Sequence, residues 1–223
     1  SDGGTSDGGT SDGGTSDGGT GDGGLDVAFT EDFEAYAAGD FVAESSDYFV
    51  PWIAGSEGGA SDAVVTSDEA DRGTNSMEII QTVDAGGDDD VVLVLGATEG
   101  TWVASWSWYV DTGAYFNVQG IDAPWGDWQQ EVLVDAEGYV YGSYSPGGTA
   151  DAIASIAVGE WVLVEYSVDF DAGTQTMLVD GVEILSNPFT GSSFAGIDFF
   201  AASASFSEPA HYYVDEISFA EVK

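Results

Sequence analysis

The chain has 223 residues, 41 of them Asp or Glu, and its only Lys or Arg residues are Arg72 and Lys223, so its formal net charge is −39. This charge excludes binding to nucleic acid or to anionic membrane surfaces, because both need clustered cationic side chains. It also opposes folding through self-repulsion, so we expect divalent cations or a salty medium to screen it; a halophilic source is the alternative explanation. A hydrophobic content of 43% allows one large all-β domain or two small ones.

The chain has no cysteine, which rules out disulfides and thiol chemistry. No apolar run approaches the ~18 residues of a transmembrane helix, so we expect no membrane insertion. The sequence begins at Ser1 without methionine or a signal-like segment. We therefore expect a processed N-terminus and a secreted or cell-surface, extracellular protein.

Residues 1–24 form a low-complexity tail. Residues 1–20 are four copies of Ser-Asp-Gly-Gly-Thr, and residues 21–25 are a decayed fifth copy. The repeat has no apolar side chain, so it cannot fold alone, and its composition is typical of a flexible acidic linker. An ordered tail would need a neighbouring subunit, a sheet edge, bound cations or covalent modification. We expect an extended Gly-rich tail over residues 1–24 and one domain over residues 25–223.

The tail offers hydroxyl groups beside small residues, a setting that leaves room for O-linked glycans. The candidate glycosylation sites are Ser1, Thr5, Ser6, Thr10, Ser11, Thr15, Ser16 and Thr20. The aspartates of the repeat could instead collect Ca²⁺, a cation that prefers oxygen ligands. Their spacing matches neither the EF-hand loop nor the calcium-binding nonapeptide repeat.

From Leu25 onward, short apolar runs separated by Gly, Asp, Asn and Pro predict a succession of strands. The expected strands are 25–30, 48–53, 63–66, 76–83, 90–95, 101–110, 114–119, 129–135, 138–144, 153–157, 160–170, 174–180, 182–186, 196–203 and 211–222. Residues 25–29 alternate and are also the best candidate for a strand inserted into a partner. Glu31–Ala38 allows at most one helical turn. The pattern predicts an all-β, two-sheet antiparallel sandwich.

The strongest local signal lies in residues 159–185. Apolar residues at every second position predict one buried strand face: Val162, Val164, Tyr166, Val168 and Phe170. Asp171-Ala172-Gly173 then turns the chain. Asp180-Gly181 predicts a two-residue type I′ hairpin, because both central residues of that turn need positive φ.

The chain carries five recognisable motifs: Glu31-Asp32-Phe33-Glu34 with Tyr36 and Gly39, Asn75–Ile79, Trp106–Val110, Gly159-Glu160-Trp161 leading to Val168-Asp169 and Val179-Asp180-Gly181, and Tyr213–Ile217. Together they resemble a concanavalin A-like (laminin G-like) jelly-roll domain of secreted bacterial surface proteins. The resemblance covers about residues 29–222. It implies the jelly-roll fold and a structural Ca²⁺ held by Glu34 and Asp215. The fold hosts lectins, glycanases and structural modules, so it leaves function open. Asp88-Asp89-Asp90 is a second calcium candidate, although three adjacent aspartates usually form a solvated turn.

No catalytic constellation is apparent. Glu131, Asp135 and Glu137 are spaced by four and two residues, which does not match the Glu-x-Asp-x-(x)-Glu strand of related glucanases and favours a solvated strand and turn. His211, the single histidine, lies in a His-Tyr-Tyr strand without a nucleophile-elbow motif, so a structural role is expected. We expect a protein that is not an enzyme.

Aromatic and amide side chains could form a sugar-binding platform; these are Trp106, Trp108, Tyr115, Asn117, Gln119, Trp125, Trp128 and Gln130. Strand alternation places Trp106 and Trp108 in the core or a subunit interface instead. The loop that contains Trp125, Asp127 and Trp128 is the remaining candidate, because exposed tryptophans often mark a binding surface.

Our interpretation of the sequence is a secreted, non-enzymatic structural subunit of an extracellular filament or surface layer. Copies of the chain would join head to tail through the N-terminal tail, since contacts that do not close produce filaments. Covalent glycans on the tail would fit this role. The alternative is a carbohydrate-binding, lectin-like adhesin module whose acidic tail is a linker.

Overall fold

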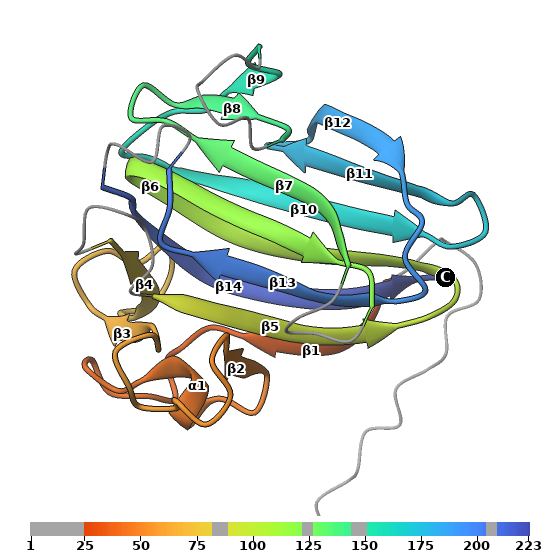
Figure 1. Cartoon of the computed structure of the whole chain (residues 1–223). Helices are drawn as coiled ribbons and strands as arrows, with labels where there is room; N and C mark the ends of the chain where they lie inside the picture. The colour runs from red at the N-terminus through yellow and green to blue at the C-terminus, as the bar shows by residue number, and fades with distance from the viewer. Residues whose placement is uncertain (1–24, 82–88, 122–126, 144–150, 204–208) are drawn as a thin grey trace, which may run out of the picture.

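The computed structural model describes residues 25–81, 89–121, 127–143, 151–203 and 209–223. The predicted tail, its candidate glycosylation sites, Asp88 and Trp125 lie outside these residues. The described chain forms two antiparallel β-sheets and one helix, α1 (Val42–Ser45). Figure 1 shows β13 (Phe194–Phe200) passing in front of β14 (His211–Val222), so the two sheets are stacked as the layers of a sandwich. The predicted all-β, two-sheet antiparallel jelly-roll sandwich is confirmed.

The first sheet is centred on β14 (His211–Val222), which pairs on one side with the first half of β6 (Thr101–Gln119). Beyond β6 follow β10 (Trp161–Asp169), β11 (Thr174–Val179) and β12 (Val182–Pro188). The other side of β14 pairs with β4 (Ser76–Ile80) near its start and with β1 (Leu25–Glu31) near its end, and β3 (Val64–Thr66) pairs with β4.

The second sheet is centred on the other half of β6, which pairs with β13 (Phe194–Phe200) and β7 (Trp128–Val134). On the β13 side follow β5 (Asp90–Ala97) and β2 (Phe49–Pro51). On the β7 side follow β8 (Tyr139–Tyr141) and β9 (Ala154–Ser155).

Strand β6 belongs to both sheets, because residues 101–113 pair with β14 and residues 114–119 pair with β7. Gly113 lies at the change of sheet with φ of 139°. A Cβ atom there would lie 2.7 Å from the Cβ of Ser203, so the close approach of the backbone also requires glycine. The sequence predicted two strands here, and the structure instead carries one long strand across the corner.

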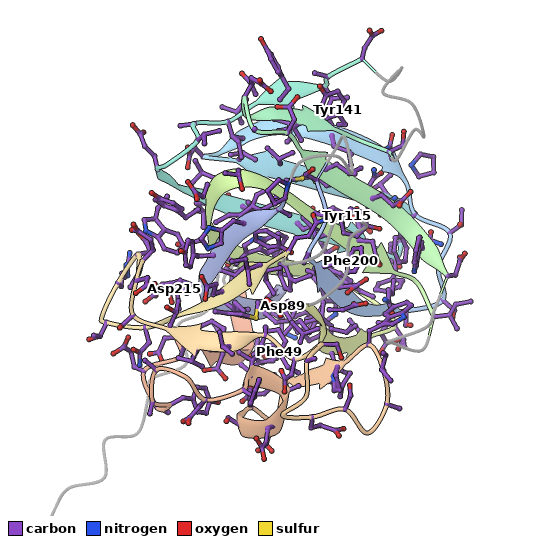
Figure 2. The ribbon with its side chains drawn as sticks, turned by 60° about the vertical axis from the view of Figure 1, so that its left-hand side comes forward. Phe49, Asp89, Tyr115, Tyr141, Phe200 and Asp215 are labelled. Atoms are coloured by element: carbon purple, nitrogen blue, oxygen red, sulfur yellow. The ribbon has the colours of Figure 1, made fainter. Side chains whose placement is uncertain are left out.

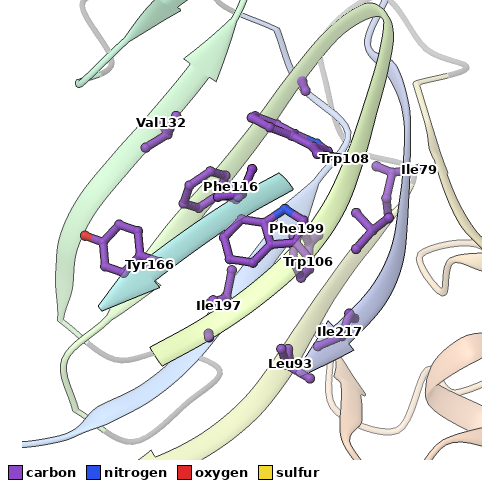
Figure 3. Close-up of a cluster of buried hydrophobic side chains, with 14 of the residues drawn as sticks. Ile79, Leu93, Trp106, Trp108, Phe116, Val132, Tyr166, Ile197, Phe199 and Ile217 are labelled. Carbon is purple, nitrogen blue, oxygen red and sulfur yellow. The ribbon is translucent and has the colours of Figure 1, made fainter. Parts of the chain in front are cut away.

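The core lies between the two sheets and is rich in aromatic rings (Figure 3). Trp106 on β6 meets Phe116 on the same strand and Phe199 on β13 edge to face, with ring centroids 5.1 and 5.7 Å apart. Trp106, Trp108 and Tyr166 have no exposed surface. Edge-to-face pairs contribute about 0.5–1.5 kcal/mol each beyond the area that they bury, so these rings hold the layers together. The predicted core position of both tryptophans is confirmed.

The hairpin predictions for residues 159–185 are confirmed. Val162, Val164, Tyr166 and Val168 are buried along β10, and Phe170 packs partly buried against the core. Asp180 and Gly181 have φ of 49° and 73°, as a type I′ turn requires. Residues 32–40 form turns and bends, in keeping with the expectation of at most one helical turn there, and the short helix α1 begins further on, at Val42. There the Asp62 carboxylate accepts the backbone N–H groups of Ala43 and Glu44.

Residues 25–29 form a strand as predicted, but its partner is the same chain's β14, with Leu25 opposite Val222. Leu25, Val27 and Val222 are 59%, 52% and 38% exposed, so this sheet edge carries an apolar patch beside the point where residues 1–24 join the domain. No helix in the described part of the chain is long and apolar enough to cross a membrane.

Candidate functional site

A pocket of about 310 Å³ opens on the outer face of the second sheet. Its lining residues come from β5, β13, β6 and β7 and from the segment after β2: Trp52, Asp90, Tyr115, Asn117, Trp128, Glu131, Asp198 and Phe200. Successive side chains of a strand point to opposite faces of the sheet. Phe116 and Phe199 point into the core, so the residues next to them on β6 and β13 point outward. The polar residues of these strands therefore gather on one face.

Three polar side chains form a row across the sheet. Asp198 on β13 lies opposite Asn117 on β6, which lies opposite Glu131 on β7. Residues directly opposite have Cβ atoms about 4.5–5.5 Å apart, close enough for the side chains to contact. The register of three strands thus places two carboxylates on either side of one amide.

A hydrogen-bonded network joins the row. Asn117 donates from Nδ2 to Asp198 Oδ2 at 2.5 Å and to the Tyr115 hydroxyl at 3.3 Å. The Tyr115 hydroxyl donates to Glu131 Oε1 at 3.0 Å. Asn117 has no exposed surface, and Tyr115 and Asp198 are each 4% exposed. These contacts fix the rotamers of the side chains, so the polar floor of the pocket is preorganised.

Asp90 on β5 lies within hydrogen-bonding reach of Asp198. Burial, reinforced by the charge of Asp198, raises the pKa of Asp90. Burial also raises the pKa of Asp198, although the hydrogen bonds from Asp90 and Asn117 act in the opposite direction. In the described part of the chain, neither Asp90 Oδ1 nor Asp198 Oδ1 accepts a hydrogen bond from an N–H or hydroxyl donor. Two carboxylates held together in this way retain a proton far more readily than free aspartates do.

Aromatic rings form the walls of the pocket. The rings of Trp52 and Trp128 lie 6.3 Å apart at an angle of 59°. Trp128 is 50% exposed, which is unusual for tryptophan. Tyr115 and Phe200 meet edge to face at 5.9 Å, and Figure 2 shows them side by side. The pocket therefore offers apolar ring faces above a polar, acidic floor.

Part of the predicted sugar platform lines this pocket, namely Tyr115, Asn117 and Trp128. Gln119 and Gln130 are buried nearby in the sheet, and Gln130 donates to the carbonyl of Gly142. Asp127 is exposed and accepts a hydrogen bond from Gln129, without lining the pocket. Trp125 lies outside the described residues.

Sequence reasoning missed Trp52, Asp198 and Phe200, treated Glu131 as a solvated residue, and considered Asp90 only as part of the second calcium candidate, Asp88–Asp90. The alternative given for that candidate, a solvated turn, does not hold for Asp89, which is 8% exposed and accepts the N–H of Ile80, and Asp90 lines the pocket. One available signal was Asp198, a lone carboxylate in the otherwise apolar run of β13. An acidic residue at such a position needs a partner or a function.

The two predicted calcium ligands both bind one loop. Glu34 Oε1 accepts the N–H groups of Thr74 and Asn75, and Asp215 accepts those of Asp71 and Arg72 at Oδ2 and of Glu216 at Oδ1. These N–H groups engage Glu34 Oε1 and both carboxylate oxygens of Asp215. No group of three or more His, Asp or Glu among the described residues is placed to hold a metal. The calcium site remains a prediction.

His211 and Asp135, which were considered as catalytic residues, make structural contacts in the described part of the chain. His211 lies between Glu78 and Asp111, with ring nitrogens 2.9 and 3.0 Å from their carboxylate oxygens. These hydrogen bonds raise the pKa of His211 and tie the start of β14 to β4 and β6. Asp135 accepts the N–H groups of Glu137 and Tyr139 and so closes the predicted turn.

Comparison with known proteins identifies the fold. No protein-family model matches the sequence, and neither does any curated protein. Among solved structures, the cellulose-induced protein Cip1 matches with a TM-score of 0.51 and 16% identity, over 86% of this chain and 96% of that one. A sialidase matches with a TM-score of 0.54 and 9% identity over 82% of this chain. Galectin LEC-6 of Caenorhabditis elegans matches with a TM-score of 0.42 and 15% identity, over 66% of this chain and 95% of that one.

The chain spans 18% of the length of the sialidase, so it corresponds to one part of that protein. Identities this low show the fold alone. The chain is a two-sheet β-sandwich of the jelly-roll type.

Proposed function

We propose that this protein is a non-enzymatic, lectin-like domain that binds carbohydrate in the pocket lined by Trp52, Trp128 and Asp198. The observation that carries the proposal is the combination of exposed aromatic walls with a buried polar row on the outer face of one sheet. Sugars present the same two features. Their C–H faces are apolar, while their hydroxyl groups both donate and accept hydrogen bonds.

The dimensions of the pocket support this match. A volume of about 310 Å³ lies at the lower end of the about 300–1,000 Å³ typical of small-molecule sites, so it suits one or two sugar rings. Trp128 can stack against a ring face, while Asp198 and Glu131 accept hydroxyl hydrogens. The network through Asn117 and Tyr115 holds these acceptors in place before a ligand arrives, which lowers the entropy cost of binding.

Carboxylate spacing supports binding without cleavage. Retaining glycosidases keep their two carboxyl groups about 5–5.5 Å apart and inverting ones about 6.5–9.5 Å apart. Asp90 and Asp198 lie within hydrogen-bonding reach of each other, which is closer than either of these spacings. We propose that this pair binds ligand groups instead of performing acid and base catalysis.

The test is a glycan array with the intact protein, followed by titration calorimetry on a bound sugar. Trp128→Ala should weaken binding about tenfold, which is about 1.4 kcal/mol. Tyr139→Ala is the matched control, because Tyr139 is also 50% exposed but lies on β8, outside the pocket. An array without any bound sugar, or a Trp128→Ala variant that binds like the unchanged protein, would contradict the proposal.

A second candidate is the filament or surface-layer subunit, in which copies of the chain join through residues 1–24. The observation that favours it is the apolar patch of Leu25, Val27 and Val222 at the junction with those residues. Both candidates are proposed for an extracellular protein, with glycans bound or attached. Deletion of residues 1–24, with Leu25→Ser and Val27→Ser tested separately, should convert large particles to monomers in light scattering. Monomers both with and without the tail would exclude this role.

A further inference from the structure

The floor of the pocket holds more negative charge than its neighbours balance. Asp198 is 4% exposed, and its Oδ1 atom, like that of Asp90, accepts no N–H or hydroxyl hydrogen bond from the described residues. Both side chains nevertheless line the pocket. A buried carboxylate that no positive charge balances is costly, and the cost falls when a ligand brings that charge into the pocket.

Neither lysine nor arginine of the protein serves this pair. Arg72 is an exposed side chain 4.0 Å from Glu216, and Lys223 contacts Asp26 and Glu221. The single histidine, His211, is held by Glu78 and Asp111. Two carboxylates in contact therefore need either a proton or a cationic group supplied from outside the protein.

We propose that the pocket selects sugars with a free amine and that the ammonium group of a 2-amino sugar binds on the pocket floor, beside Asp90 and Asp198. This inference rests on the proposed carbohydrate-binding function. An ammonium group brings three N–H donors and a positive charge, which can serve the carboxylates that line the floor. The carboxylate pair retains a proton in the unbound pocket, and this proton leaves to solvent when the ammonium group binds.

The walls of the pocket fit the same ligand. Trp52, Trp128 and Phe200 line the pocket together with the acidic residues, and the faces of aromatic rings attract cations. The sugar ring that carries the amine can therefore stack while its charge points to the floor. A negatively charged sugar would meet Asp90, Asp198 and Glu131 together, so the pocket should reject uronic and sialic acids.

A divalent metal fits less well. Ca²⁺ takes 6–8 oxygen ligands, whereas the floor offers two unpartnered carboxylate oxygens and its walls are aromatic. The described residues also include no group of three acidic or histidine side chains placed to hold a metal. An ammonium group needs fewer acceptors and tolerates aromatic neighbours, so it suits this site better.

The experiment compares three β-1,4-linked tetrasaccharides of equal length in titration calorimetry with the full chain: glucosamine, N-acetylglucosamine and glucose. The glucosamine tetramer should bind at least tenfold more tightly than the other two. Asp198→Asn keeps the shape of the side chain and removes its charge, so it should abolish this preference. Glu183→Gln, at an exposed carboxylate on β12 outside the pocket, should leave the preference intact.

Salt and a competitor complete the design. Attraction by the overall charge of −39 should disappear at about 1 M salt, where the screening length is about 3 Å, whereas a contact inside the pocket persists. A glucosamine preference that survives Asp198→Asn, or that vanishes in salt, would overturn the assignment. A polyamine that binds as tightly as the tetramer would also overturn it, because the ligand would then be any amine.

The outcomes also separate this inference from the proposed function. If the three tetramers bind equally and Trp128→Ala weakens all of them, carbohydrate binding stands and the amine preference is overturned. If no tetramer and no sugar on the array binds, the proposed function itself fails. Melting curves of each variant show that a lost preference does not reflect a lost fold.

Discussion

Two buried aspartates of this molecule have opposite surroundings. Asp215 on β14 has no exposed surface and accepts hydrogen bonds from three backbone N–H groups. Asp198 on β13 is almost as buried, yet it accepts the amide of Asn117 and otherwise faces Asp90. Burial raises the pKa of both, and the N–H groups around Asp215 offset part of that rise, which leaves its pKa at about 6.

The difference shows how a chain with two Lys or Arg residues uses its acidic side chains. Backbone N–H groups serve as the positive partners: Asp62 accepts those of Ala43, Glu44 and Gly58 and so holds the helix-bearing loop. A carboxylate surrounded by N–H groups organises a loop. A carboxylate that lacks them needs another partner, and the Asp90–Asp198 pair, with one oxygen of each side chain unpartnered among the described residues, is in that position.

The largest expected effect comes from removing the loop-binding carboxylate. Asp215→Ala leaves the N–H groups of Asp71, Arg72 and Glu216 without their acceptor, and should destabilise the protein by about 3 kcal/mol. For a domain of this size, that lowers the melting temperature by about 6–12 °C. Thermal unfolding measures the change, with the exposed Glu183→Ala as control. An unchanged melting temperature would show that water replaces the carboxylate without cost.

The second prediction concerns a substitution that should stabilise the protein. The raised pKa of Asp198 means that the native state retains a proton that the unfolded chain releases above the ordinary value of 3.8, so stability falls as pH rises from there to neutrality. Asp198→Asn removes this loss. Near pH 7 we expect this variant to be about 1 kcal/mol more stable than the unchanged protein, which raises its melting temperature by about 2–4 °C. Near pH 4 the two proteins should melt at the same temperature. A difference that does not depend on pH would argue against a charged pair.

The smallest effect concerns Glu34, whose exposed carboxylate accepts the N–H groups of Thr74 and Asn75. These hydrogen bonds lower its pKa from the ordinary 4.5, so its contribution to stability is present at neutral pH and is lost as the pH falls through the lowered value. Glu34→Gln should slightly lower the melting temperature at pH 7 and have no effect in strong acid. If a chelator reproduces the effect of Glu34→Gln, the predicted calcium site would gain support at the expense of the N–H contacts.

Much of the fold could be predicted because its signals are local. Alternation along β10 and the Asp180-Gly181 turn depend on neighbouring residues, and both appear as expected. The continuity of β6 could not be predicted, because a glycine such as Gly113 usually marks a break or a bend in a strand. The bend by which β6 passes from one sheet to the other forms only when the two sheets pack together.

The pocket was harder to predict, because its residues come together only when distant strands pair. Asp90 and Asp198 meet because β5 pairs with β13, and no local pattern reports that pairing. A run of aspartates suggests a solvated turn, and only the pairing of β5 buries the last of them. Trp128 could be identified because an exposed tryptophan in a polar loop is conspicuous, whereas Trp52 looks like an ordinary end of a strand.

The pairing of β1 with β14 has a mechanical consequence. Leu25 lies opposite Val222, so tension applied at these two positions pulls the paired strands apart from one end. Backbone hydrogen bonds then break one pair after another instead of sharing the load, as they would if the strands were sheared. A fibre stretched through both ends of each subunit would therefore yield first at β1, at low force, while the sandwich stays intact. Pulling single molecules by residues 25 and 222 should show this early, small extension before the main rupture.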